Sequence, residues 1–212
     1  DWNDPGNQIE QTLRLEAHGI SERTIRPAQP ARKPERPVLG APVKSGLIGG
    51  LVRHWRFDEG VGLATTERQS GKACAIGGPA AYWRPGVSGT CLSFDSYSSF
   101  VTLPAAEAPH LAGEFTVSAW VALQEYPFNL AAIVEHREGN RGYLLGVNAR
   151  GQVELKLGHG DFTQSVTTER VPLYDWLHVA AVFKHGAKAV VYLQGTPVAT
   201  SADVTAFVDA SH

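Results

Sequence analysis

The sequence predicts an all-β protein, an antiparallel β-sandwich of the jelly-roll type with an extended N-terminal arm. Apolar and polar residues alternate in about ten short stretches at roughly ten-residue spacing. Gly, Pro and Ser residues separate these stretches, and no convincing helical period appears. The central stretch, FTVSAWVAL at 115–123, has apolar residues at every odd position and mixed ones at the even positions. This alternation predicts a strand with one buried face.

The clearest hairpin joins GYLLGVN and QVELKLG through the turn Ala149-Arg150-Gly151, whose glycine suits a position that needs a positive φ. In its second arm the alternation predicts one face exposed to water. LSFD and FVTLP are predicted to form another hairpin. Other strands are predicted at 51–59, 131–136, 162–169, 176–183, 189–194 and 198–201.

The chain divides into three parts by composition. Residues 1–24 contain the alternating stretch IEQTLRLEA (9–17), which predicts a strand-like arm or the remnant of an upstream domain, with an amphipathic helical turn as the alternative. Residues 25–45 are rich in Pro and Arg, as in an extended linker. Residues 46–212 form the predicted β domain.

The overall charge excludes some classes of partner. A net charge of −2 predicts no nucleic-acid partner, and no apolar run approaches the length of a membrane span. The chain has no initiating Met and no signal-like region at its start, so we interpret it as a mature or excised piece.

Two cysteines, Cys74 and Cys91, allow one disulfide around the loop that contains Trp83. Two buried free thiols are the alternative. Their spacing does not fit a zinc site, because no CxxC pair is present.

Several segments together resemble a known family. WRFDE, GTCLSFDSYSSFVTLP, FTVSAWVAL, RGYLLGVNARGQVELKLG and DWLHVAAVFKHGAKAVVYLQGTPVA follow the order seen in laminin-G-like, concanavalin-A-like jelly rolls of bacterial extracellular proteins. The similarity runs from about Leu51 to Ser201 and implies the fold and an extracytoplasmic location. Because the family is functionally diverse, it implies no single activity. Gln194 replaces the Asn of the family's Tyr-x-Asn-Gly turn.

The family's closing strand, Gly-x-Ile-Asp-Glu-Val, is not found in this chain. An open sheet edge of that kind invites pairing. We expect the slot to be filled by Ile9 to Ala17, by a partner chain, or by sequence outside this chain.

Three aromatic residues, Trp120, Trp176 and Tyr192, are candidate ligand-binding residues because they lie on strands whose opposite face is aliphatic. One interpretation is an aromatic platform for sugar rings. The other is that these rings fill a second core layer, as large aromatic residues commonly do.

Loop residues and a pair of acids complete the candidate set. His136 and Arg141 are predicted in one polar loop and His159 in another, where sandwich domains often place binding residues. Asp58 and Glu59 lie at the end of the first predicted strand, and the resemblance implies calcium as their ligand. A structural role for this acidic pair is the alternative.

Catalytic patterns are absent from the sequence. The paired carboxylates that related glucanases carry along one strand do not occur, and no HExxH or Gly-x-Ser-x-Gly motif is present. The sequence therefore favours a non-catalytic extracytoplasmic module that binds glycan or protein surfaces as part of a larger protein. The alternative is an assembly module that docks to a partner subunit by strand addition, and a glycoside-active enzyme is a distant third.

Overall fold

The computed structural model describes residues 50–111, 113–161, 163–184, 186–204, 207 and 209–210. Within these residues the protein is all-β apart from the short 3-10 helix η2 (Ala105–Glu107) and a 3-10 conformation at Gly50. The predicted arm (1–24), the linker (25–45) and the candidate strand Ile9 to Ala17 lie outside the described residues, so these remain predictions.

The strands follow one another along the chain with short connections. Their bounds are β1 Ala64–Thr66, β2 Ala73–Gly77, β3 Tyr82–Pro85, β4 Thr90–Ser93, β5 Phe100–Thr102, β6 Glu114–Val121, β7 Ala131–Glu138, β8 Arg141–Val147, β9 Gln152–Gly158, β10 Thr163–Arg170, β11 Leu177–Lys184, β12 Lys188–Leu193 and β13 Thr196–Asp203.

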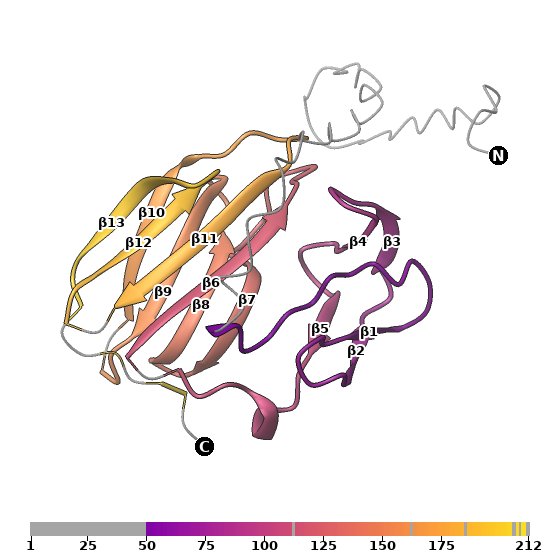
Figure 1. The fold of residues 1–212 in the computed structure, drawn as a ribbon. Helices are drawn as coiled ribbons and strands as arrows, with labels where there is room; N and C mark the ends of the chain where they lie inside the picture. Colours follow the sequence, from indigo (N-terminus) through magenta and orange to yellow (C-terminus); the bar gives the residue numbers. More distant parts are fainter. Residues whose placement is uncertain are drawn as a thin grey trace, which may run out of the picture. The chain divides into compact units, whose positions relative to one another are not determined.

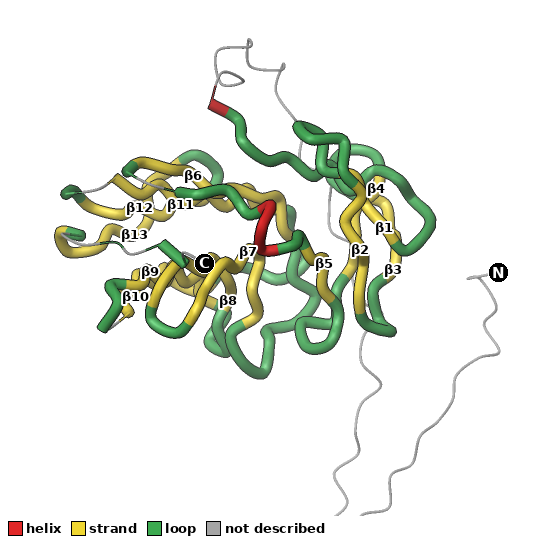
Figure 2. The backbone as a smooth tube through the Cα atoms, turned by 90° about the horizontal axis from the view of Figure 1, so that it is seen from below, coloured by secondary structure: helices red, strands yellow, loops and turns green. Residues whose placement is uncertain are grey.

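Strands β6 to β13 form the predicted sandwich (Figure 1). One antiparallel sheet has the order β13-β12-β11-β6, called here the β11 sheet, and the other has the order β10-β9-β8-β7, called the β9 sheet. Figure 2 shows the two sheets as two layers. Strand β10 lies near β12 and β13, so the sheets approach each other along that side.

The core lies between the two sheets, because each sends its apolar residues inward. Strand β6 pairs with β11 along its whole length, with Phe115 opposite Phe183 and Val117 opposite Ala181. The predicted apolar face of 115–123 therefore points into the core, as expected. The most deeply buried core residues come from the middle strands of each sheet, and include Leu145, Val153, Leu155, Leu157, Val179, Ala181, Phe183, Ala189 and Val191.

The hairpin β8–β9 is confirmed, with its turn where the sequence predicts it. Gly151 has a φ of 75°, in the left-handed region that glycine adopts without strain. A Cβ at this position would also overlap the ring of Tyr126. Glycine is therefore required here for both backbone conformation and packing.

Residues 50–107, called here the small-sheet region, differ from the prediction. Two small sheets form, with the orders β1-β2-β5 and β3-β4. The predicted hairpin of LSFD with FVTLP is wrong, because β4 pairs with β3 and β5 pairs with β2. A turn does form between β4 and β5, where the Asp95 carboxylate accepts hydrogen bonds from the backbone N–H groups of 97, 98 and 99.

The strand predicted at 51–59 is also wrong, apart from a single bridge between Trp55 and Glu67. The N–H of His54 donates to the Glu67 carboxylate and its C=O accepts from Arg68, so no regular ladder forms there. Phe57 then takes a φ of 55°, which ends the extended conformation.

Both cysteines are free thiols. Cys74 lies on β2 and Cys91 on β4, which belong to different sheets. The Cys74 sulfur accepts a hydrogen bond from the indole N–H of Trp55 at 3.3 Å. The disulfide alternative is thus not realised, and the free-thiol alternative describes the pair, although only Cys74 is fully buried.

Candidate functional site

The outer face of the β11 sheet carries an exposed aromatic pair. Because Val179 and Ala181 point into the core, the neighbouring residue His178 points outward, as does Trp120 across from it on β6. The rings of Trp120 and His178 lie 5.3 Å apart at a tilt of 55°. Trp120 keeps 37% of its surface exposed, which places it outside the core between the sheets.

Tyr192 lies on the same outer face, one row along. Its register partner on β11 is Ala180, whose own partner on β6 is Ser118. The small side chains of Ser118 and Ala180 therefore stand beside the Trp120–His178 row, with the half-buried Tyr192 at the end of their row. We call Trp120, Ser118, His178, Ala180 and Tyr192 the aromatic surface.

Gln194 holds one end of the aromatic surface in place. It has a φ of 51° in the tight turn between β12 and β13. Its side-chain Oε1 accepts from the N–H of His178 at 2.9 Å, and its Nε2 donates to the C=O of Trp176 at 3.4 Å. Trp176 itself is half-buried just before β11. The substitution noted in the sequence thus ties the turn to the start of β11, a link that sequence spacing does not reveal.

The aromatic surface is electrically neutral near Trp120. Partial burial lowers the pKa of His178 below the ordinary value for histidine, so its imidazole is uncharged at neutral pH. The ion pair between Glu114 and Lys184, at 2.8 Å, lies at the opposite end of β6 and β11.

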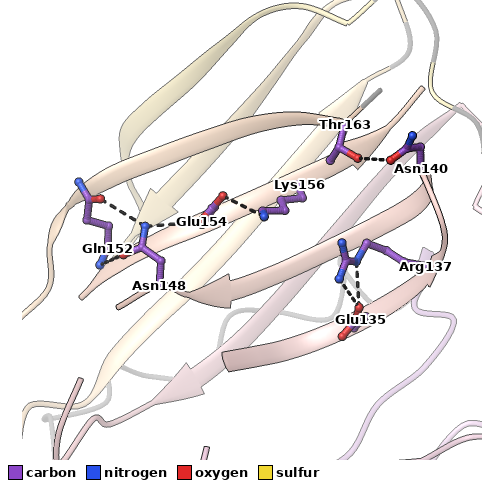
Figure 3. A network of polar contacts seen from close by, with 8 residues as sticks. All are labelled: Glu135, Arg137, Asn140, Asn148, Gln152, Glu154, Lys156 and Thr163. Atoms are coloured by element: carbon purple, nitrogen blue, oxygen red, sulfur yellow. Dashed lines mark hydrogen bonds and ion pairs between the residues drawn. The ribbon is translucent and has the colours of Figure 1, made fainter. Parts of the chain in front are cut away.

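The outer face of the β9 sheet is polar and charged (Figure 3). Arg137 and Glu135 form an ion pair at 2.6 Å on β7, and Lys156 and Glu154 form one at 3.6 Å on β9. Asn148 donates to the side chain of Glu154 at 3.3 Å. The alternation in QVELKLG predicted that one face of β9 is exposed to solvent. Nothing in the sequence showed that β7 lies two strands from β9 on the same sheet.

The carboxylates of this polar face do not have the one-strand arrangement of the related glucanases. Glu135 and Glu154 come from strands separated by β8, and each has a cation beside it. This arrangement neutralises both groups and leaves neither with an obvious catalytic partner.

His136 lies on the strand predicted at 131–136, and its placement in the polar loop that follows is wrong. It belongs to β7, because this strand continues to Glu138 before a short turn. Its ring meets that of Tyr143 edge-on with centroids 6.2 Å apart, and its Nδ1 lies 3.7 Å from the Asp209 carboxylate. His136 is thus largely enclosed by neighbouring side chains.

The other two predicted loop residues lie near one end of the β9 sheet. Arg141 is exposed at the start of β8, and His159 follows β9 with its Nε2 3.2 Å from the side chain of Gln164. Asn140 links the two loops by donating to the C=O of Asp161 at 3.0 Å. These residues belong to a different sheet from Trp120, so the structure does not place the six candidates on one surface.

Asp58 and Glu59 already have partners within the small-sheet region. Asp58 pairs with Arg56 at 3.1 Å and Arg68 at 2.8 Å. Glu59 accepts from the N–H of Thr66 at 2.8 Å. In the part of the chain that the structure describes, no group of three or more His, Cys, Asp or Glu residues could hold a metal ion. Calcium at this rim stays a prediction, and it would have to displace the two arginines.

Comparison with known proteins agrees with this architecture. The Laminin_G_3 family, described as the concanavalin A-like lectin/glucanases superfamily, matches residues 95–212. This chain belongs to that superfamily. No curated protein matches the sequence of this superfamily member.

Solved structures share its fold at low sequence identity. A botulinum neurotoxin type C chain, from work on its interaction with two ganglioside molecules, is 15% identical with a TM-score of 0.52 over 72% of this chain and 41% of that one. Domain 4 of AbnA, an extracellular arabinanase of Geobacillus stearothermophilus in complex with arabinotriose, is 14% identical with a TM-score of 0.52 over 69% of this chain and 73% of that one. The superfamily member thus spans less than half of the neurotoxin chain.

Membrane insertion through a helix has no candidate in the described part of the chain. No helix there is both long and apolar enough to cross a bilayer.

Proposed function

We propose that this chain is a non-catalytic module that binds glycans through the aromatic surface around Trp120, on behalf of a larger extracytoplasmic protein. The observation that carries the proposal is the exposed Trp120 ring, held against His178 on the outside of a packed sheet. The C–H face of a sugar ring can stack on such a ring, while nearby polar groups bind its hydroxyls.

The supporting strands make this surface rigid before any ligand arrives. The inward neighbours of Trp120 and His178 pack in the core, and Gln194 binds the backbone of His178. A preorganised surface loses little conformational freedom on binding, which favours affinity. Domain 4 of AbnA in complex with arabinotriose supports the view that this fold can hold a sugar.

The absence of catalysis is part of the same proposal. On the polar face, Glu135 is paired with Arg137 and the half-buried Glu154 with Lys156. On the aromatic surface, the described register neighbours of Trp120 include no acid. We therefore expect binding without hydrolysis, to be checked by incubating the protein with each bound glycan and analysing the products.

The proposal is tested by a glycan array followed by calorimetric titration, in calcium and again with a chelator. Trp120→Ala should weaken binding by at least about tenfold, because it removes the stacking surface. The matched control is Tyr97→Ala, which removes a ring that is 94% exposed but lies outside the aromatic surface.

Equal loss in both variants, or no effect of Trp120→Ala on a glycan that does bind, would contradict the proposed site. A blank array from folded protein would contradict glycan binding itself. Loss of signal with the chelator alone would support calcium near Asp58.

A second candidate function, assembly with a partner subunit, is favoured by the edges of the sandwich. Among the described strands, β6 pairs only with β11 and β7 only with β8. The inward residues of β6 are half-buried, whereas Val179, Ala181 and Phe183 of β11 are 0–1% exposed. An added strand would cover this side of the core. A persistent oligomer in light scattering, together with a blank glycan array, would favour this function.

A further inference from the structure

We infer that the aromatic surface selects neutral glycans and rejects acidic ones. The inference rests on the proposed function and concerns the distribution of charge around Trp120. It follows from what β6, β11 and β12 present on the outer face of the β11 sheet.

The outward residues next to Trp120 have no ionised side chain. Strand β11 presents His178 there, whose imidazole is neutral in its half-buried position. The other outward residues of the three strands in this area are apolar or hydroxyl-bearing, namely Thr116, Ser118, Ala180, Val182, Val190 and Tyr192.

The charged residues of this face are gathered at its far end. Glu114 and Lys184 are six residues along their strands from the Trp120–His178 pair, a separation of about 20 Å. They also neutralise each other at 2.8 Å, and the exposed Lys188 lies at the same end. At the near end, the exposed residue preceding Trp176 is Asp175, an acid.

Among the described residues of β6, β11 and β12, a carboxylate or sulfate bound beside Trp120 would therefore find no cation next to it. It would lose part of its hydration against Trp120 and Tyr192 without a compensating charge, which is unfavourable. The polar face of the β9 sheet offers the opposite environment, with Arg137 and Lys156 exposed to solvent in part. The contrast assigns neutral sugars to the aromatic surface.

A neutral sugar can satisfy what this surface offers. Its C–H face would lie on the Trp120 ring, and its hydroxyls would reach the exposed hydroxyls of Ser118 and Thr116. Neither interaction requires charge. The ligand class is thus an uncharged hexose or pentose oligosaccharide rather than a uronic, sialylated or sulfated one.

The test is calorimetric titration of the whole chain with two neutral probes, cellotriose and arabinotriose, and two acidic probes, trigalacturonic acid and sialyllactose. We expect at least one neutral probe to bind on the order of tenfold more tightly than either acidic probe. Ala180→Lys, which places a cation between the rings, should reduce this preference. The matched control is Ser165→Lys, at an exposed position on β10 of the other sheet, and it should leave the preference unchanged.

The outcomes separate the inference from the proposed function. Tighter binding of an acidic probe that is lost in Trp120→Ala would overturn the inference and keep the function. Equal affinity of the wild-type protein for neutral and acidic probes would also overturn the inference. So would equal effects of Ala180→Lys and Ser165→Lys on the preference for neutral probes. Binding of no glycan at all, here or on the array, would overturn the function instead.

Discussion

The sandwich and the small-sheet region are stabilised in different ways. In the sandwich, the middle strands bury continuous apolar faces, and residues such as Leu155, Val179 and Phe183 are 0–1% exposed. In the small-sheet region the strands are only three to five residues long, and its fully enclosed side chains include a charged one, Glu67, at 0% exposure. Short strands cannot bury enough apolar area alone, so hydrogen bonds from side chains to backbone take a larger share there.

Glu67 shows how this works. Its carboxylate accepts the backbone N–H groups of His54, Gln69 and Ser70 and the Ser70 hydroxyl, at 2.6–2.9 Å. One side chain thereby joins the segment before β1 to the turn after it. We therefore expect the stability of the sandwich to depend on its apolar core and little on its surface charges. We expect the small-sheet region to depend on the buried charge of Glu67.

The largest effect is expected in the sandwich core. Leu155→Ala should lower the free energy of unfolding by about 2–5 kcal/mol, because it removes a buried side chain and leaves a cavity between the sheets. The free energy of unfolding is measured by urea titration, with tryptophan fluorescence as the signal. The control is Leu63→Ala, whose side chain is 77% exposed, and it should change the unfolding free energy little. Similar losses in both variants would contradict this account of the core.

A smaller and more local effect is expected from Glu67→Gln. It should cost about 1–3 kcal/mol, since a buried network of charge-assisted hydrogen bonds loses its acceptor charge. Amide hydrogen exchange should rise at 54, 69 and 70 before it rises in β9 or β11. Glu125→Gln, at an exposed position, is the control. Uniform acceleration across the sandwich would show that the two regions are not distinct in this way.

Acid should affect the small-sheet region first. Burial alone would raise the pKa of Glu67, but the hydrogen bonds from Ser70, Gln69 and His54 outweigh it and lower the pKa to about 2. Because the unfolded chain binds the proton more readily, this stabilisation is complete above the ordinary glutamate pKa and is lost as the pH falls towards 2. Hydrogen bonds from Ser98 and the backbone also lower the pKa of Asp95. The measurement is the protection factor of the amides at 54 and 70 at pH 6 and at pH 3. Glu67→Gln should remove most of the difference between these two protection factors.

The smallest effect is expected on the polar face of the sandwich. Lys156→Gln removes a partly exposed cation 3.6 Å from Glu154, and should change the unfolding free energy by less than about 1 kcal/mol. The effect should shrink further in 1 M salt. A loss as large as that of Glu67→Gln would break the contrast between the two regions.

The long strands of the sandwich could be predicted from the sequence because their alternation matches their burial. Strand β6 is the example, with Phe115, Val117 and Val121 facing the core as the pattern predicts. The segment 51–59 alternates as well, yet it forms no regular strand, because Glu67 occupies the backbone N–H of His54. Periodicity reports which residues prefer burial, and it cannot report a side chain that competes for backbone hydrogen bonds.

The candidate site was foreseen only in part. Trp120 and Tyr192 were candidates from their strand positions, but the pattern alone could not distinguish an outer surface from a second core layer. His178 was not predicted, although its even-numbered position on a strand with odd-numbered core residues was a usable signal. Its place beside Trp120 depends on the register between β6 and β11, which are more than fifty residues apart in the chain.

The class of fold, the hairpin at Gly151 and the faces of the long strands can be predicted from the chain's residues alone, because they depend on local periodicity and on backbone conformation. The pairing of the strands, the charge of each outer face and the burial of Glu67 appear only in the folded protein. Those features depend on contacts between residues far apart in the chain, whose free energies exist only once both partners are in place.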